Sequence, residues 1–145
     1  MSKPRSAARL AAVQALYQLE MENTPMAALL HEFHSHRLGA TIEDATYAEA
    51  EVDFFNDVVK GVDARRDEID GVVGQHLSKE WNFDRLDKLL KQILRAGTYE
   101  LLARREIPVV GIIYEYLDVA GAFYDKREKG FVNGILDSVA KTARA

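Results

Sequence analysis

Two short basic segments carry residue types that could bind RNA. The first is the N-terminal arm, in which Lys3, Arg5 and Arg9 are accompanied by no acidic residue. Arg5 and Arg9 are four positions apart, so in a helix they would share one face. The planar guanidinium group of arginine fits phosphate oxygens through paired hydrogen bonds. This arm is therefore a candidate phosphate-binding element.

The second segment runs from Lys126 to Lys129 and leads through Gly130 to Phe131. Positive charge beside an aromatic ring suits single-stranded RNA, which proteins hold by phosphate contacts and base stacking. Phe131 also lies on an apolar row with Ile135 and Val139, and the spacing alone favours a core position for it. Both interpretations of Phe131 are open from the residues themselves.

The residues that could support catalysis or metal binding do not form a complete site. His31, His34 and His36 cannot all face one metal from a single helix, and the chain has no cysteine or HExxH motif. Glu115 and Asp118 have the spacing of an acid and base pair, but such pairs are common on solvated helix faces. The sequence also lacks a phosphate-binding loop and a nucleophile elbow. It predicts a protein with no enzymatic activity, cofactor or metal.

Composition predicts a single soluble domain over residues 1–145. A chain of 145 residues with 48% hydrophobic content can bury a substantial core. The lack of cysteine is compatible with a reducing cytoplasm, and no stretch approaches the roughly 20 apolar residues of a membrane helix. The net charge is −4, yet residues 1–19 hold three Lys/Arg and no acid, and residues 125–145 hold five Lys/Arg against three acids. Basic ends and an acidic middle would suit an anionic ligand and a basic partner.

Several apolar patterns with a period of 3.6 residues predict an all-α fold. Gly61, inside the longest pattern, marks either a close helix crossing or a bend. Gly130 and Gly134, in the last pattern, suggest close approach of another backbone. The expected helices cover about Arg5–Met21, Pro25–Leu38, a long segment that Thr46 caps, Asp84–Arg105 as one helix or two, Pro108–Tyr124, and a last helix around 129–137.

Four of these segments resemble signatures of the NusB family of bacterial transcription antitermination factors. They are Ala12–Tyr17 (AVQALY), Ile93–Leu101, the Ile107-Pro108 turn and Phe131–Asp137 (FVNGILD), in the family's order and spacing. The resemblance implies an all-helical fold of about seven helices in two packed subbundles and a role that is not enzymatic. It also implies binding of a boxA RNA element together with NusE, a small-subunit ribosomal protein, within the antitermination complex of RNA polymerase on ribosomal RNA operons.

Carried over residue by residue, the resemblance places RNA contacts on both basic segments. The implied contacts are Lys3, Arg5, Arg9, Tyr17, Arg127, Lys129 and Phe131. The chain departs from the family pattern where Ser6, Ala7 and Ala8 interrupt the arginine cluster and where Gly130 replaces a lysine. Fewer cations release fewer counterions, so we expect weak RNA binding by the protein alone, a shallow salt dependence and a strong requirement for NusE, which would dock on the acidic body.

A different class of function is a protein-binding helical module without RNA function of its own. Such a module could be a homodimer that hides its RNA surface. The noncatalytic domain of some RNA cytosine methyltransferases resembles the same family, but we expect no catalytic domain in a chain of this length.

Overall fold

The computed structural model describes residues 3–34, 45–78 and 82–145, and this part of the chain is helical without any strand. The all-α prediction is therefore confirmed. Within these ranges no helix is both long and apolar enough to cross a membrane. The elements in chain order are α1 (Lys3–Glu22), α2 (Met26–Phe33), α3 (Ala45–Ala64), α4 (Arg66–Gln75), the 3-10 turn η3 (Phe83–Arg85), α5 (Lys88–Ala103), α6 (Val109–Gly121) and α7 (Lys126–Ala143).

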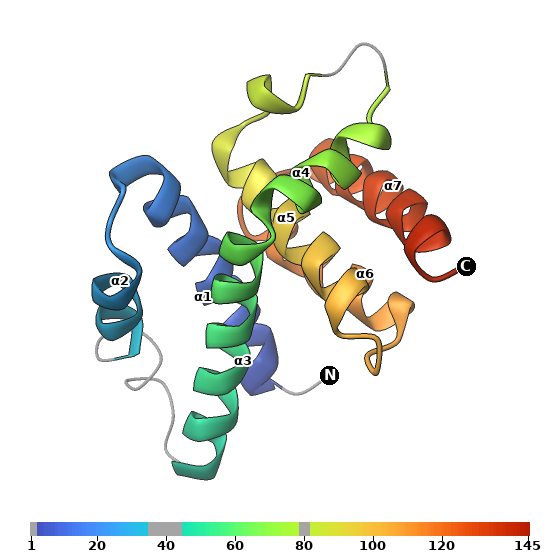
Figure 1. Cartoon of the computed structure of the whole chain (residues 1–145). Helices are drawn as coiled ribbons and strands as arrows, with labels where there is room; N and C mark the ends of the chain where they lie inside the picture. Colours follow the sequence, from blue (N-terminus) through green and yellow to red (C-terminus); the bar gives the residue numbers. More distant parts are fainter. Residues whose placement is uncertain (1–2, 35–44, 79–81) are drawn as a thin grey trace.

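Helix α5 is the centre of the fold. All twelve residues from Leu90 to Leu101 are buried, so the helix is covered on every side. Two groups of helices pack on α5. One group consists of α1 and α3, together with α2, which packs on α1. The other group consists of α4, α6 and α7 (Figure 1). A surface helix needs an apolar stripe on one face only. The continuous burial of α5 shows that it joins the two groups.

Helix boundaries follow local capping groups that the sequence shows only in part. Helix α1 ends just before Asn23, which takes a left-handed conformation with φ of 53°. Asn82 accepts a hydrogen bond from the Asp84 backbone N–H and begins η3. Asp87 accepts one from the Leu90 N–H and begins α5. The predicted segment 84–105 is therefore a short turn followed by one long helix.

Two other predicted boundaries differ from the structure. Helix α3 begins at Ala45, so Thr46 lies inside the helix and does not cap it. The long third segment is two helices, because Arg65 leaves helical geometry (φ −111°, ψ 20°) between α3 and α4. The predicted end of the second helix, at Leu38, lies outside the described residues.

Gly61 is a close helix crossing, and the bend occurs four residues later. A Cβ atom at Gly61 would lie 2.2 Å from the Tyr99 ring of α5. The Tyr99 ring cannot easily move, since the side chain is only 6% exposed and its hydroxyl donates to Asp57 over 2.7 Å. In contrast, a Cβ at Gly130 or Gly134 would meet no atom within 4 Å. The expectation that these two glycines allow a close backbone approach is wrong.

Arg144 holds the C-terminus against the end of α5. The Arg144 guanidinium donates to the backbone carbonyls of Leu101 (2.9 Å), Ile107 (2.6 Å) and Arg104 (2.8 Å), and to that of Glu100 (3.2 Å). The last carbonyls of a helix lack partners within the helix and carry partial negative charge, so a cation satisfies them well. Arg144 thereby holds the end of α7 against the end of α5.

The two glycine environments give a prediction with an internal control. We expect Gly61→Ala to lower the free energy of unfolding by about 1–3 kcal/mol, because the methyl group overlaps a ring that is held in place. We expect Gly134→Ala to raise it by about 0.5–1 kcal/mol, because the methyl group enters open space and alanine favours the helix. Urea unfolding of both variants measures the difference. Effects of the same sign would contradict the assignment of Gly61 as a crossing.

Candidate nucleic-acid interface

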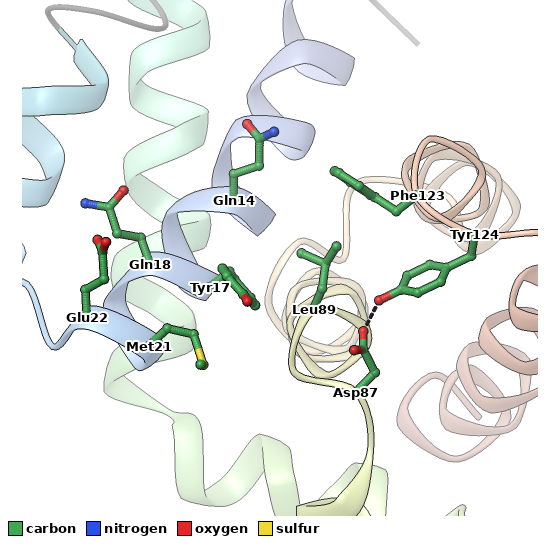
Figure 2. Close-up of a pocket in the computed structure, with 9 residues that line it drawn as sticks. All are labelled: Gln14, Tyr17, Gln18, Met21, Glu22, Asp87, Leu89, Phe123 and Tyr124. Atoms are coloured by element: carbon green, nitrogen blue, oxygen red, sulfur yellow. Dashed lines mark hydrogen bonds between the residues drawn. The ribbon is translucent and has the colours of Figure 1, made fainter.

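A groove lies where the second half of α1 faces the start of α5 and the turn between α6 and α7 (Figure 2). Its volume is about 780 Å³. We call it the α1–α5 groove. The residues that line it are Gln14, Tyr17, Gln18, Met21, Glu22, Asp87, Leu89, Phe123 and Tyr124.

Large apolar side chains form much of the groove wall and are unusually exposed. Tyr17 is 38%, Phe123 40% and Met21 50% exposed. Figure 2 shows the side chains of Tyr17 and Phe123 entering the same space from opposite sides, with Leu89 between them. On a protein surface, a contiguous cluster of exposed hydrophobic side chains often marks a binding surface, whereas singly scattered ones are ordinary. The cluster is therefore a candidate binding site.

The α6–α7 turn is held in place by a bond to the start of α5. The Tyr124 hydroxyl donates to the Asp87 carboxylate, which also accepts the Leu90 backbone N–H. Burial and the neighbouring Asp87 carboxylate raise the pKa of Tyr124 well above its ordinary value. The hydroxyl therefore stays a donor at neutral pH and keeps Phe123, the preceding residue, at the groove edge.

The second basic segment lies beside this turn. Helix α7 begins at Lys126, so the segment Lys126–Lys129 forms the first turn of a helix. Lys126, Arg127 and Lys129 are all exposed. The Lys129 side chain runs past the end of α6, its Nζ within 3.5 Å of a Cβ placed on Gly121. Basic side chains at a helix start oppose the helix dipole, so this basic turn is better suited to an anionic ligand than to helix stability.

Phe131 is neither fully core nor fully surface. It is half-buried and packs against the edge of the hydrophobic core, while Val132 and Leu136 of the same helix are completely buried. A role for Phe131 in RNA contact remains a prediction.

Arg9 occupies a different environment from the one that the resemblance implies. Its side chain is completely buried. Its guanidinium donates to both carboxylate oxygens of Glu100, over 2.9 and 3.0 Å, and to Glu115 over 3.0 Å. Burial alone would lower the pKa of Arg9, but the hydrogen bonds and charge of Glu100 raise it above the ordinary value. Arg9 is thus a permanently charged structural residue that cannot reach a phosphate in this structure.

Glu115 belongs to the same buried cluster, so the expectation of a solvated helix face was wrong for this residue. It accepts a hydrogen bond from Ser6 over 2.5 Å in addition to its contact with Arg9. Tyr116 donates its hydroxyl hydrogen bond to Glu100. Burial and the adjacent carboxylate of Glu100 raise the pKa of Tyr116 well above its ordinary value. The cluster joins α1, α5 and α6.

The rest of the N-terminal arm also turns partly inward. The guanidinium groups of Arg5 and Arg9 both lie 4.7 Å from the centre of the Phe54 ring, and that of Arg104 lies 5.0 Å from it. Arg5 and Arg9 therefore share a helix face as predicted, but that face packs on α3. Arg5 is half-buried. Lys3 begins α1, and its side chain lies outside the described part of the structure.

The histidines form no metal site in the part of the chain that the structure describes, and no other cluster of potential metal ligands occurs there. His31 is exposed, and the ring of His34 is hydrogen-bonded to the Asn56 side chain over 2.7 Å. His36 lies outside the described residues.

Of the nine residues that line the groove, sequence reasoning found only Tyr17. Periodicity assigned Leu89 to the core, and the structure shows it half-buried against the core. Met21 and Phe123 lie at or near the ends of predicted helices, and no sequence motif marked them as exposed binding residues. Tyr17 was found through the family resemblance alone.

Three comparisons with known proteins agree on one family. The model of the NusB family matches residues 6–141. The "Transcription antitermination protein NusB" of Novosphingobium aromaticivorans is 64% identical over 142 residues, which cover 98% of this chain and 96% of that protein. A crystal form of T. maritima NusB is 31% identical with a TM-score of 0.80, over 97% of this chain and 93% of that one. A crystal structure of the antitermination factors NusB and NusE in complex with dsRNA contains a chain of the same fold, 24% identical with a TM-score of 0.80, over 98% of this chain and 99% of that one.

The buried position of Arg9 gives a direct prediction. We expect Arg9→Met to lower the free energy of unfolding by about 3–5 kcal/mol, because it leaves the Glu100 and Glu115 carboxylates buried without their cation. The control Arg127→Met removes an exposed arginine and should change stability by no more than about 0.5 kcal/mol. Urea unfolding measures both. Unchanged stability of Arg9→Met together with weaker RNA binding would show that Arg9 is a ligand contact.

Proposed function

Because this chain belongs to the NusB family, we propose that it is a transcription antitermination factor that binds boxA-type single-stranded RNA together with NusE. The observation that carries the proposal is the exposed aromatic groove beside the basic turn of α7. In this role it acts as an adaptor in the antitermination complex of RNA polymerase and supports transcription of ribosomal RNA operons. It performs no chemical reaction on the RNA.

The two parts of the surface suit the two chemical parts of RNA. Lys126, Arg127 and Lys129 are exposed cations for phosphate oxygens, and phosphate contacts position a nucleic acid without reading its sequence. Tyr17 and Phe123 offer exposed aromatic rings on which bases can stack. The arrangement favours an unpaired strand, because bases in a duplex already stack on one another.

The small number of available cations supports a shared RNA surface. Arg9 is buried and Arg5 is half-buried against Phe54, so the arm presents fewer charges than its sequence contains. Weak electrostatic attraction by this chain alone requires a second protein to complete the site. The solved complex of NusB and NusE with dsRNA supports NusE as that protein, since its NusB chain shares this fold. We propose that NusE, a small-subunit ribosomal protein, docks on the acidic body.

Fluorescence anisotropy with a labelled boxA-like RNA tests the proposal. We expect weak binding by the protein alone and a clear gain when NusE is added, with preference over a scrambled RNA of the same composition. Failure to prefer the boxA-like RNA in either condition would refute the proposal. In that case a dimer in light scattering would favour a protein-binding module.

Neutralising the basic turn provides the matched variant. Replacing Lys126, Arg127 and Lys129 with glutamine should weaken RNA binding and reduce the slope of log K against log salt by about 2, since each lost phosphate contact on a single strand accounts for roughly 0.7. Lys141→Gln is the control, because Lys141 is exposed, lies about three helical turns beyond Lys129 on α7, and pairs with Asp137 one turn before it. Its salt slope should stay that of the unmodified protein. Equal slopes for the triple variant and the control would place the phosphates elsewhere.

A further inference from the structure

We propose that the outer face of α6 is a docking surface for a basic amphipathic helix of a partner protein. This face, which we call the α6 outer face, consists of Val110, Tyr114, Asp118 and the half-buried Leu117. It lies outside the α1–α5 groove, since none of these residues lines that groove. The inference goes beyond the proposed function and does not depend on RNA binding.

Two large apolar side chains on this face are mostly exposed to solvent. Val110 is 80% and Tyr114 68% exposed, more than any other large hydrophobic residue in the described ranges. They are four positions apart, so they lie one helical turn apart on the same side of α6. A single exposed apolar residue is ordinary, but two adjacent ones form a contiguous patch of the kind that binds a partner.

The stability of α6 itself does not explain these two residues. Valine and tyrosine are weaker helix formers than alanine, because their side chains lose rotamer freedom against the preceding turn. Burial compensates for this cost at Ile112 and Tyr116, which are completely buried in the same helix. Val110 and Tyr114 gain little from burial within this chain. A partner that covers them would supply that compensation.

Charge selects the class of partner. Asp118 is exposed on α6 one turn beyond Tyr114, and it forms no ion pair with any residue in the described ranges. The α6 helix itself contains no lysine or arginine. A lysine or arginine of a partner protein would therefore complement this carboxylate, next to an apolar contact with Val110 and Tyr114.

The same charges argue against two other occupants. A second copy of the chain would pair α6 with an identical helix, which has no cation to offer to Asp118. RNA would bring its phosphates towards this carboxylate. The Lys129 side chain lies against Gly121, at the end of α6 that joins the basic turn, so positive charge borders the face at one end only.

The side of α6 that faces the protein holds the helix firmly in place. Glu115, the residue after Tyr114, accepts hydrogen bonds from Ser6 and Arg9 of α1, and Tyr116 is completely buried. A surface on a helix that is already fixed needs little ordering when a partner binds. A partner helix with apolar residues three or four positions apart can lie along such a face. Contact with one helix buries a small area, so we expect a weak, transient interaction.

The test uses the full chain, isotope-labelled for NMR, and a synthetic helical peptide as the probe. The peptide carries two leucines four positions apart, flanked on the same face by lysines, and a matched peptide has glutamates in place of the lysines. We expect the lysine peptide to shift the amide resonances around Val110, Tyr114 and Asp118, and to bind more tightly than the glutamate peptide. The absence of shifts at this face with about 1 mM lysine peptide, the weak limit of specific association, would overturn the proposal.

Substitutions on the α6 outer face sharpen the test. Replacing both Val110 and Tyr114 with alanine should weaken peptide binding by about 10-fold or more, as loss of interface anchors does. The variant should still fold, because both side chains are exposed. Asp118→Lys should reverse the preference, so that the glutamate peptide binds about 2- to 5-fold more tightly, the range for an exposed ion pair. The matched control Asp137→Lys replaces an exposed acid on α7 and should leave the preference unchanged.

Three further results would each overturn the proposal by indicating a different contact. If Tyr17→Ala removes peptide binding while the double alanine variant keeps it, the peptide occupies the α1–α5 groove. If the double alanine variant changes self-association in light scattering but not peptide affinity, a second copy covers the face. If it weakens binding of boxA-like RNA but not of the peptide, RNA covers the face. RNA binding by the unmodified protein decides the proposed function separately.

Discussion

The buried contact of Arg9 with Glu100 and Glu115 is the constraint on which the arrangement of α1, α5 and α6 depends. Charged groups lose much hydration energy on burial, and only close geometry with further hydrogen bonds compensates for that loss. Here the guanidinium uses three of its donors on two carboxylates. Ser6 donates to the Glu115 oxygen that also accepts from Arg9, and Tyr116 donates to a Glu100 oxygen that also accepts from Arg9. Since these partners come from three helices, a slip of α1 along α5 would leave a buried charge without a partner.

A second ionic contact fixes the other end of α1. Arg95 of α5 donates to Glu20 of α1 over 2.8 Å and to Asp70 of α4 over 2.8 Å. Burial on its own would raise the pKa of Glu20, but the hydrogen bond and charge of Arg95 lower it below its ordinary value. Glu20 therefore stays ionised at neutral pH and keeps the contact. Tyr17 lies between these two ionic contacts along α1. Its exposed ring is therefore carried by a helix that both contacts hold in position.

Periodicity predicted the helices well because a helical period is a local property of the chain. The same reasoning could not place Arg9, whose partners are 91 and 106 residues away in the sequence. From sequence, a charged residue near a basic N-terminus is assigned to the surface, since buried arginine is rare without partners. The glycines show the same limit: Gly61 and Gly134 look alike in sequence, and only the Tyr99 ring on another helix makes one of them necessary. The groove was missed for this reason as well, since its wall is assembled from three elements.

The burial of Arg9 also changes how the proposed RNA surface must work. A surface with many free cations gains affinity from counterion release and loses it steeply with salt. This chain places one arginine of its N-terminal arm in the core and packs another against Phe54, which leaves most of the described phosphate-binding charge on the first turn of α7. Under the proposed function, contacts that do not depend on charge must account for a larger share of the affinity for RNA. The proposed function therefore depends on the exposed cations of this turn and on a partner protein that supplies further positive charge.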